Sequence, residues 1–135
     1  MCLSVNNDDK ADALPIAREL AALGFNIVGT RGTAAYLRAH GIDASVVYKV
    51  NEGRPSLADE IVNRKISMVI NTPLGRESFF DDKAVRRAAM MNSVPCVTTM
   101  TGAAAAVQAI RALRTEPLDV RPLQDYHITV SAESA

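Results

Sequence analysis

The chain has 135 residues, of which 48% are hydrophobic and 22% charged, and its fifteen basic residues balance fifteen acidic ones. This length fits one domain with a hydrophobic core of useful size. The neutral balance and the 4% aromatic content argue against nucleic-acid binding, which needs surplus positive charge and rings for stacking. No apolar run approaches the roughly 20 residues of a membrane span and no signal peptide is evident, so we expect a cytoplasmic protein.

Strand and helix signals alternate in chain order. Strand 2–5 precedes a helix that ends at Gly24 and that should begin close to Pro15, because proline suits a first turn. Strand 25–28 leads through a Thr-x-Gly-Thr turn into a helix that Gly41 terminates. Strand 44–50 precedes a helix that Ser56 and Asp59 begin with a capping box and that should turn Leu57, Ile61 and Val62 inward. The remaining pairs are strand 67–71 with a helix capped by Asp81 or Asp82, and strand 94–99 with helix 102–113.

This alternation predicts an α/β fold with three αβα layers, in which a five-stranded parallel sheet carries helices on both faces. We expect one domain over residues 1–125 and a polar tail over 126–135, and the segment from Glu116 onward should wrap the surface or fray. Open sheets of this kind bind ligands at the carboxyl ends of their strands, near the switch in strand order.

Hydroxyls, amides and cations follow all five predicted strands. In chain order they are Ser4, Asn6, Asn7 and Lys10; Thr30, Arg31, Gly32 and Thr33; Tyr48, Lys49 and Arg54; Asn71, Thr72 and Arg76; and Thr98, Thr99, Thr101 and Gly102. Because parallel strands end at one edge of a sheet, these groups should gather there.

The Thr-x-Gly-Thr turn predicts a phosphate-binding site. Gly32 allows a ligand to approach the backbone, and Thr33 stands at a helix start, where free N–H groups favour an anion. The hydroxyls of Thr30 and Thr33 can donate to phosphate oxygens, and Lys10 and Lys49 can supply positive charge. The alternative is that Thr33 is only a helix cap and Gly32 only a turn residue.

Proton carriers are scarce near this edge. His40 belongs to a helix end and His127 to the tail, while Asp8, Asp9 and Glu52 are more typical of solvated or charge-neutralising acids. Cys2 and Cys96 lack metal-ligand spacing and are expected to be buried free thiols. The site should therefore hold an anion without transforming it.

Six segments in order resemble the C-terminal regulatory domain of carbamoyl-phosphate synthase large chains: "SVNNDDK", "GTRGTAAYL", "YKVNEGRPS", "VINTPLGR", "AVRRAA" and "VPCVTTMTGAAAAVQAI". The resemblance covers roughly residues 3 to 125. It implies a methylglyoxal-synthase-like fold with strand order 3-2-1-4-5. It also implies a nucleotide-effector domain that is not itself catalytic and holds no cofactor or metal.

The same resemblance implies partners and roles. A uridine or inosine monophosphate would bind its phosphate to Lys10, Thr30, Gly32, Thr33 and Lys49 and its ribose to Asn71 and Thr72, with Ser4, Arg31 and Arg54 as further candidates. Pro73 replaces a ribose-binding threonine of some relatives, and Asn7 replaces a common aspartate. The full enzyme would be an ATP-dependent ligase of pyrimidine and arginine biosynthesis that uses magnesium or manganese and a glutaminase small subunit. The chain would then be a domain cut from that longer polypeptide.

Two other functions stay open. One is methylglyoxal synthase, which eliminates phosphate from dihydroxyacetone phosphate with a catalytic aspartate in the loop after the third strand. Here Asp59 lies one turn into the following helix, too far from that loop position for the reaction. The related purine-pathway cyclohydrolase would need a basic "KTLHPK"-type segment that is absent. The second open function is docking or dimerisation without a ligand, which an exposed apolar patch would favour.

Overall fold

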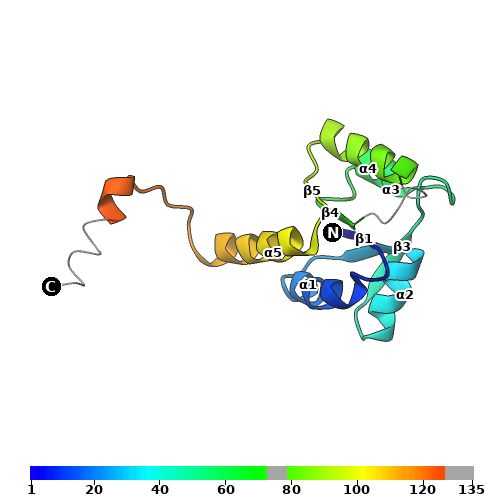
Figure 1. The fold of residues 1–135 in the computed structure, drawn as a ribbon, viewed down its shortest axis with the longest axis horizontal. Coiled ribbons are helices and arrows are strands. Elements are labelled where there is room, and N and C mark those ends of the chain that lie inside the picture. Colours follow the sequence, from blue (N-terminus) through cyan, green and yellow to red (C-terminus); the bar gives the residue numbers. More distant parts are fainter. Residues whose placement is uncertain (73–78, 127–135) are drawn as a thin grey trace.

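The structure is a computed structural model that describes residues 1–72 and 79–126, and it contains a central sheet between two layers of helices (Figure 1). The strands are β1 (Cys2–Val5), β2 (Ile27–Thr30), β3 (Ala44–Val47), β4 (Val69–Thr72) and β5 (Cys96–Val97). All are parallel, in the order β3-β2-β1-β4-β5. The predicted fold class and strand order are confirmed.

The helices are α1 (Lys10–Ala22), α2 (Arg31–Ala39), α3 (Leu57–Val62), α4 (Phe79–Met91) and α5 (Met100–Thr115). Helices α1, α2 and α5 cover one face of the sheet, and α3 and α4 cover the other (Figure 1). The first layer buries a core that includes Leu20, Leu37 and Val107. The second layer buries a smaller core that includes Leu57, Ile61 and Val85. No helix of the described residues is long and apolar enough to cross a membrane.

The ends of several elements follow local rules. Gly24 and Gly41 follow α1 and α2 with φ of 86° and 82°, the left-handed conformation that glycine adopts at little cost. Ser56 and Asp59 form the predicted capping box at the start of α3. Glycine is also favoured at residue 29 in β2, because a Cβ there would make a tight contact of 3.0 Å with the backbone nitrogen of Ala34.

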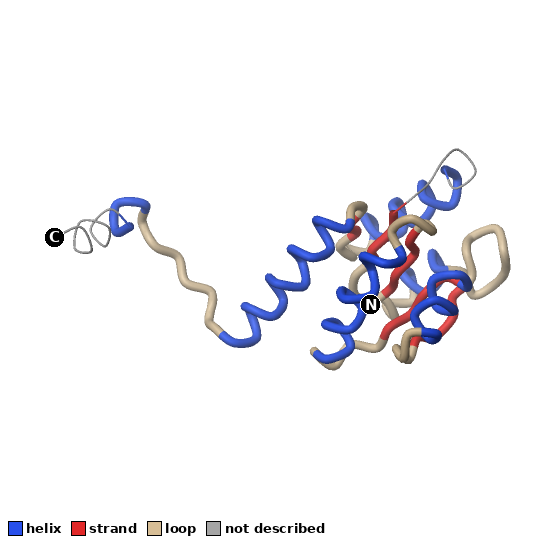
Figure 2. Tube along the Cα trace, turned by 60° about the horizontal axis from the view of Figure 1, so that its bottom comes forward, coloured by secondary structure: helices blue, strands red, loops and turns tan. Residues whose placement is uncertain are grey.

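Two local predictions were wrong. Helix α1 begins at Lys10, so Pro15 is its sixth residue and does not lie near its start. Proline has no N–H to donate to the carbonyl of Ala11, but both residues are exposed, so water can reach that carbonyl. Val62, expected in the core, is 57% exposed because α3 turns it outward at its last residue. For the segment from Glu116 onward we expected wrapping or fraying, and wrapping is not observed. Residues 116–126 are all exposed and lead away beyond α5, with a helical turn at 123–126 (Figure 2).

Candidate effector site

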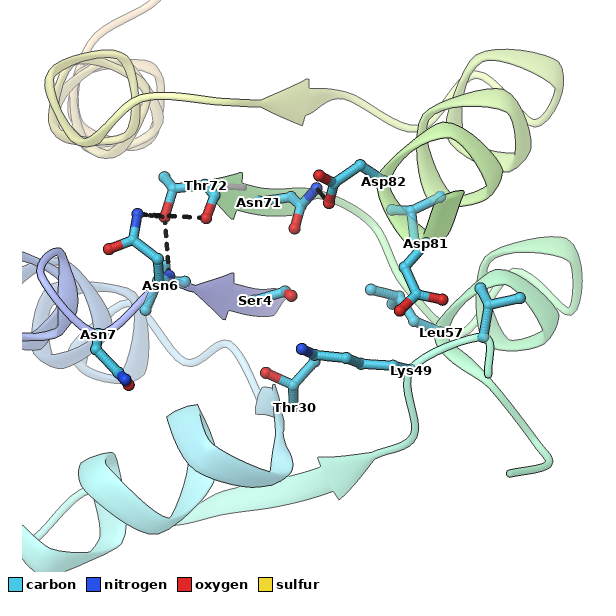
Figure 3. Close-up of a pocket in the computed structure, with 13 residues that line it drawn as sticks. Ser4, Asn6, Asn7, Thr30, Lys49, Leu57, Asn71, Thr72, Asp81 and Asp82 are labelled. Carbon is cyan, nitrogen blue, oxygen red and sulfur yellow. Dashed lines mark hydrogen bonds between the residues drawn. The ribbon is translucent and has the colours of Figure 1, made fainter. Parts of the chain in front are cut away.

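A pocket of about 230 Å³ lies at the carboxyl ends of the strands, beside the switch between β1 and β4 (Figure 3). Such a crevice is where open parallel sheets bind ligands. Its lining residues come from four strand ends and from α3 and α4: Ser4, Val5, Asn6, Asn7, Thr30, Lys49, Val50, Leu57, Asn71, Thr72, Asp81, Asp82 and Val85.

Asn6 joins the ends of β1 and β4 and fixes the start of α1. Its backbone N–H donates to Thr72 Oγ1 at 3.2 Å. Its side chain donates to Asp9 Oδ2 at 2.7 Å and accepts from the Asp9 backbone N–H at 3.0 Å. Because Asp9 directly precedes α1, these bonds set where Lys10 begins the helix. They also engage Asp9 in a structural role.

Thr30 and Thr33 form the corner between β2 and α2. Thr30 is both the last residue of β2 and the residue before α2. Its side chain makes no capping bond, so the first N–H groups of α2 have no side-chain acceptor among the described residues. Thr33 is 2% exposed; its hydroxyl accepts from the Val5 N–H at 3.3 Å and lies 3.4 Å from the Val5 carbonyl oxygen and 3.2 Å from Thr30 Oγ1. Thr33 thus ties α2 to β1, a role that the sequence did not indicate.

Two lysines approach this corner from different elements. Lys49 follows β3, lines the pocket and points its ammonium toward Thr30 (Figure 3). Lys10 lies in the first turn of α1, and its Nζ is 3.4 Å from where a Cβ on Gly32 would stand. Lys49 and Thr30 thus make one end of the pocket positive, beside the open N-terminus of α2, and the Lys10 ammonium lies at that N-terminus. Lys10, Gly32 and Thr33 do not themselves line the pocket.

The opposite end of the pocket is acidic, which sequence reasoning missed. Asp81 and Asp82 lie inside the first turn of α4, which begins at Phe79, so neither is the cap that we expected. Asp82 Oδ1 accepts from Asn71 Nδ2 at 2.9 Å. Asp81 Oδ1 is buried and has no hydrogen-bond partner among the described residues. The Asp-Asp pair itself was the available signal, because one turn of a helix can direct two neighbouring carboxylates toward a sheet edge.

Several predicted residues lie elsewhere. Arg31 and Arg54 do not line the pocket; Arg54 is 87% exposed and contacts Asp59 at 3.4 Å. Hydrogen bonds from the Ser56 backbone and hydroxyl hold the pKa of Asp59 below its ordinary value, so this carboxylate is engaged in the capping box. Thr99 does not reach the pocket and instead caps α5 by accepting from the Gly102 N–H at 3.0 Å. Pro73, Arg76 and His127 lie outside the described residues.

Comparison with known proteins defines the class. Residues 12–98 match the family model of the MGS-like domain, where MGS denotes methylglyoxal synthase, and the chain belongs to this family. The crystal structure of ForH shares the fold, with a TM-score of 0.56 and 20% identity over 80% of this chain and 78% of ForH.

The relatives are more specific. The carbamoyl phosphate synthase large chains of Acidobacterium capsulatum and Synechocystis sp. are each 47% identical to this chain over 92% of its length. That of Gemmatimonas aurantiaca is 42% identical over 98%. The chain spans only 11–12% of the length of these relatives. The segment-by-segment resemblance to synthase large chains is thereby confirmed.

Proposed function

We propose that this chain is the nucleotide-effector domain of a carbamoyl-phosphate synthase large chain, and that a nucleoside monophosphate binds in the pocket beside β1 and β4. The observation that carries the proposal is the convergence of Lys49, Lys10 and the open N-terminus of α2 on the Thr30–Thr33 corner. Ammonium groups, hydroxyls and free backbone N–H groups are the donors that bind phosphate in proteins.

The acidic end supports a nucleotide over a simple phosphate. A phosphate at the Lys49 end would leave the rest of the ligand beside Asn71, Thr72 and Asp81. A carboxylate oxygen without a partner is a strong acceptor for a ribose hydroxyl, since burial without a hydrogen bond costs about 1–3 kcal/mol. At about 230 Å³ the pocket is smaller than drug-sized sites, so we expect it to enclose phosphate and ribose and leave the base at its mouth. Uridine and inosine monophosphates would then both fit.

The regulatory mechanism follows from the number of elements that the ligand would join. The pocket draws on the ends of β1, β2, β3 and β4 and on the first turn of α4. A bound nucleotide would hold these segments in one arrangement and shift the population sensed by the adjoining catalytic domains. Such coupling is typically about 1–3 kcal/mol. The catalytic reaction, its ATP with magnesium or manganese and the glutaminase small subunit would belong to the remainder of that cytoplasmic enzyme.

Thermal unfolding of the chain with uridine or inosine monophosphate tests the proposal. At 100 times its dissociation constant a ligand stabilises its protein by about 2.7 kcal/mol, or about 10 °C for a domain of this size. Lys49→Ala should abolish most of the shift. Lys65→Ala is the matched control, because Lys65 is an exposed lysine that contacts Glu60, away from the pocket. Equal shifts in wild type and Lys49→Ala would contradict the proposal.

One observation favours a second function. Elimination of phosphate from dihydroxyacetone phosphate needs a carboxylate base near a phosphate site, and Asp81 supplies a carboxylate that the sequence did not place there. Steady-state assay of methylglyoxal formation distinguishes the two functions. Turnover that disappears in Asp81→Asn would establish the enzyme; nucleotide binding without turnover supports the effector domain.

A further inference from the structure

The outer face of α4 is both cationic and apolar. Met90 and Met91 are 81% and 73% exposed, and Lys83, Arg86 and Arg87 are exposed on the same side of the helix. Val85 and Ala89 occupy the opposite side and are buried. None of the three cations forms an ion pair with another described residue. We call these five residues the α4 outer face: Lys83, Arg86, Arg87, Met90 and Met91.

Residues 116–126, which we call the arm, have the complementary character. Four large side chains are 59–88% exposed there: Leu118, Val120, Leu123 and Tyr126. The arm also carries three carboxylates, Glu116, Asp119 and Asp125, and one guanidinium, Arg121, which give a net charge of −2. Leaving so many apolar side chains in water along one short segment is typical of an unoccupied binding surface.

Helix α5 holds the arm away from its own body. Arg111 pairs with Glu19 of α1 at 2.6 Å. Arg114 donates to the Leu23 carbonyl just beyond α1, and its guanidinium lies 4.7 Å from the centre of the Phe25 ring. The last turns of α5 are therefore fixed to the end of α1, on the face of the sheet opposite α4 (Figure 1). The arm leaves from this fixed point and projects outward (Figure 2).

We propose that the arm of one copy binds the α4 outer face of a second copy, and that two copies exchange arms reciprocally. The net charges, −2 on the arm and three cations on the helix, are complementary, and each surface brings large apolar groups to the contact. Helix α4 has 13 residues, a length of about 20 Å, and residues 116–122 of the arm, which precede the helical turn at 123–126, can span about that length when extended. Reciprocal exchange uses the same patches on both copies and closes as a two-fold dimer. This inference does not depend on the nucleotide site.

Sedimentation of the 135-residue chain over a range of concentrations tests the exchange. The wild type should form a dimer. Lys83→Glu with Arg87→Glu, and separately Leu118→Ser with Val120→Ser, should each raise the dimer dissociation constant by about tenfold or more. Val62→Ser is the matched control, because Val62 is 57% exposed on neighbouring α3 and should not affect the dimer. Circular dichroism melts identify any variant that has lost its fold.

A charge-reversal experiment on both surfaces distinguishes a specific contact from non-specific association. Adding Glu116→Lys and Asp119→Lys to the Lys83→Glu, Arg87→Glu variant should restore dimerisation, since the opposite charges again face each other. A wild-type monomer at every concentration would overturn the proposal and leave both surfaces to a different partner. Dimerisation unaffected by the arm substitutions, or a charge exchange without rescue, would also overturn it.

Discussion

The ammonium of Lys10 lies over Gly32, 3.4 Å from the point that a Cβ on Gly32 would occupy. Gly32 is exposed in the first turn of α2 and has no positive φ, so the backbone itself does not require glycine. Gly32→Ala should therefore leave stability unchanged or raise it by up to about 1 kcal/mol. Its methyl group would occupy the approach to the α2 N-terminus, and we expect nucleotide binding to weaken about tenfold or more, or about 1.4 kcal/mol.

The matched comparison is Gly29→Ala. A Cβ at residue 29 would lie 3.0 Å from the nitrogen and 3.3 Å from the Cα of Ala34, neither of which a side-chain rotation can move. We expect a loss of about 1–3 kcal/mol in denaturant unfolding. If Gly32→Ala destabilised the fold as much as Gly29→Ala, Gly32 would be a structural glycine and the phosphate interpretation would lose support.

Thr33→Val should destabilise the fold even without ligand. The substitution keeps the shape but leaves the buried N–H of Val5 without its acceptor, at a cost of about 1–3 kcal/mol. Thr101→Val, an exposed threonine in the first turn of α5, is the control and should change stability by less than about 0.5 kcal/mol. Indistinguishable urea midpoints for the two variants would show that the Thr33 hydroxyl contributes little.

The capping box predicts a contribution to acid stability. Hydrogen bonds from Ser56 lower the pKa of Asp59 in the folded chain, so the unfolded chain binds the proton more readily. The stabilisation is present above the ordinary carboxyl pKa of about 4 and is lost as the pH falls through the lowered value. Asp59→Asn should be less stable at neutral pH and should lose less stability on acidification. Parallel stability–pH curves for wild type and variant would contradict this account.

The two cysteines should differ in reactivity. Burial raises the pKa of Cys2 to about 12, and it raises the pKa of half-buried Cys96 against the opposing effect of Arg86. A thiol-specific reagent should modify Cys96 slowly and Cys2 only when the chain unfolds. Cys2 on β1 and Cys96 on β5 are the strand neighbours of Val69 on either side of β4, so their Cα atoms lie about 10 Å apart. At that separation a disulfide cannot form unless the strands move. Rapid modification of both thiols, followed by mass spectrometry, would exclude this packing.

The fold was predictable because each element carries its own local signals. Apolar runs with a strand period, the capping box of Ser56 and Asp59 and the glycines after α1 and α2 all agree with one topology. The helix containing Pro15 was harder to place, because tertiary packing of Leu20 and its neighbours outweighs the loss of one hydrogen bond at an exposed turn.

The candidate site was predictable only in part. Lys49 and Thr30 follow strands directly, so the parallel topology alone brings them to one edge. Whether Asp81 faces that edge depends on where α4 begins and how it rotates, which long-range packing decides. The structural role of Thr33 likewise depends on Val5, a residue 28 positions away in sequence. Arg54 comes later in the loop after β3 than Lys49 does, and its exposed side chain contacts Asp59 outside the pocket.

Calorimetric titration of the chain with uridine monophosphate and with uridine tests the central claim most directly. The two ligands differ only in the phosphate, which we place between Lys10, Lys49 and the start of α2. The monophosphate should bind at least about a hundredfold more tightly, since charge-assisted hydrogen bonds to phosphate contribute about 1.5–3 kcal/mol each. Equal affinity for nucleotide and nucleoside, or no binding of either uridine or inosine monophosphate, would contradict a phosphate-binding effector site.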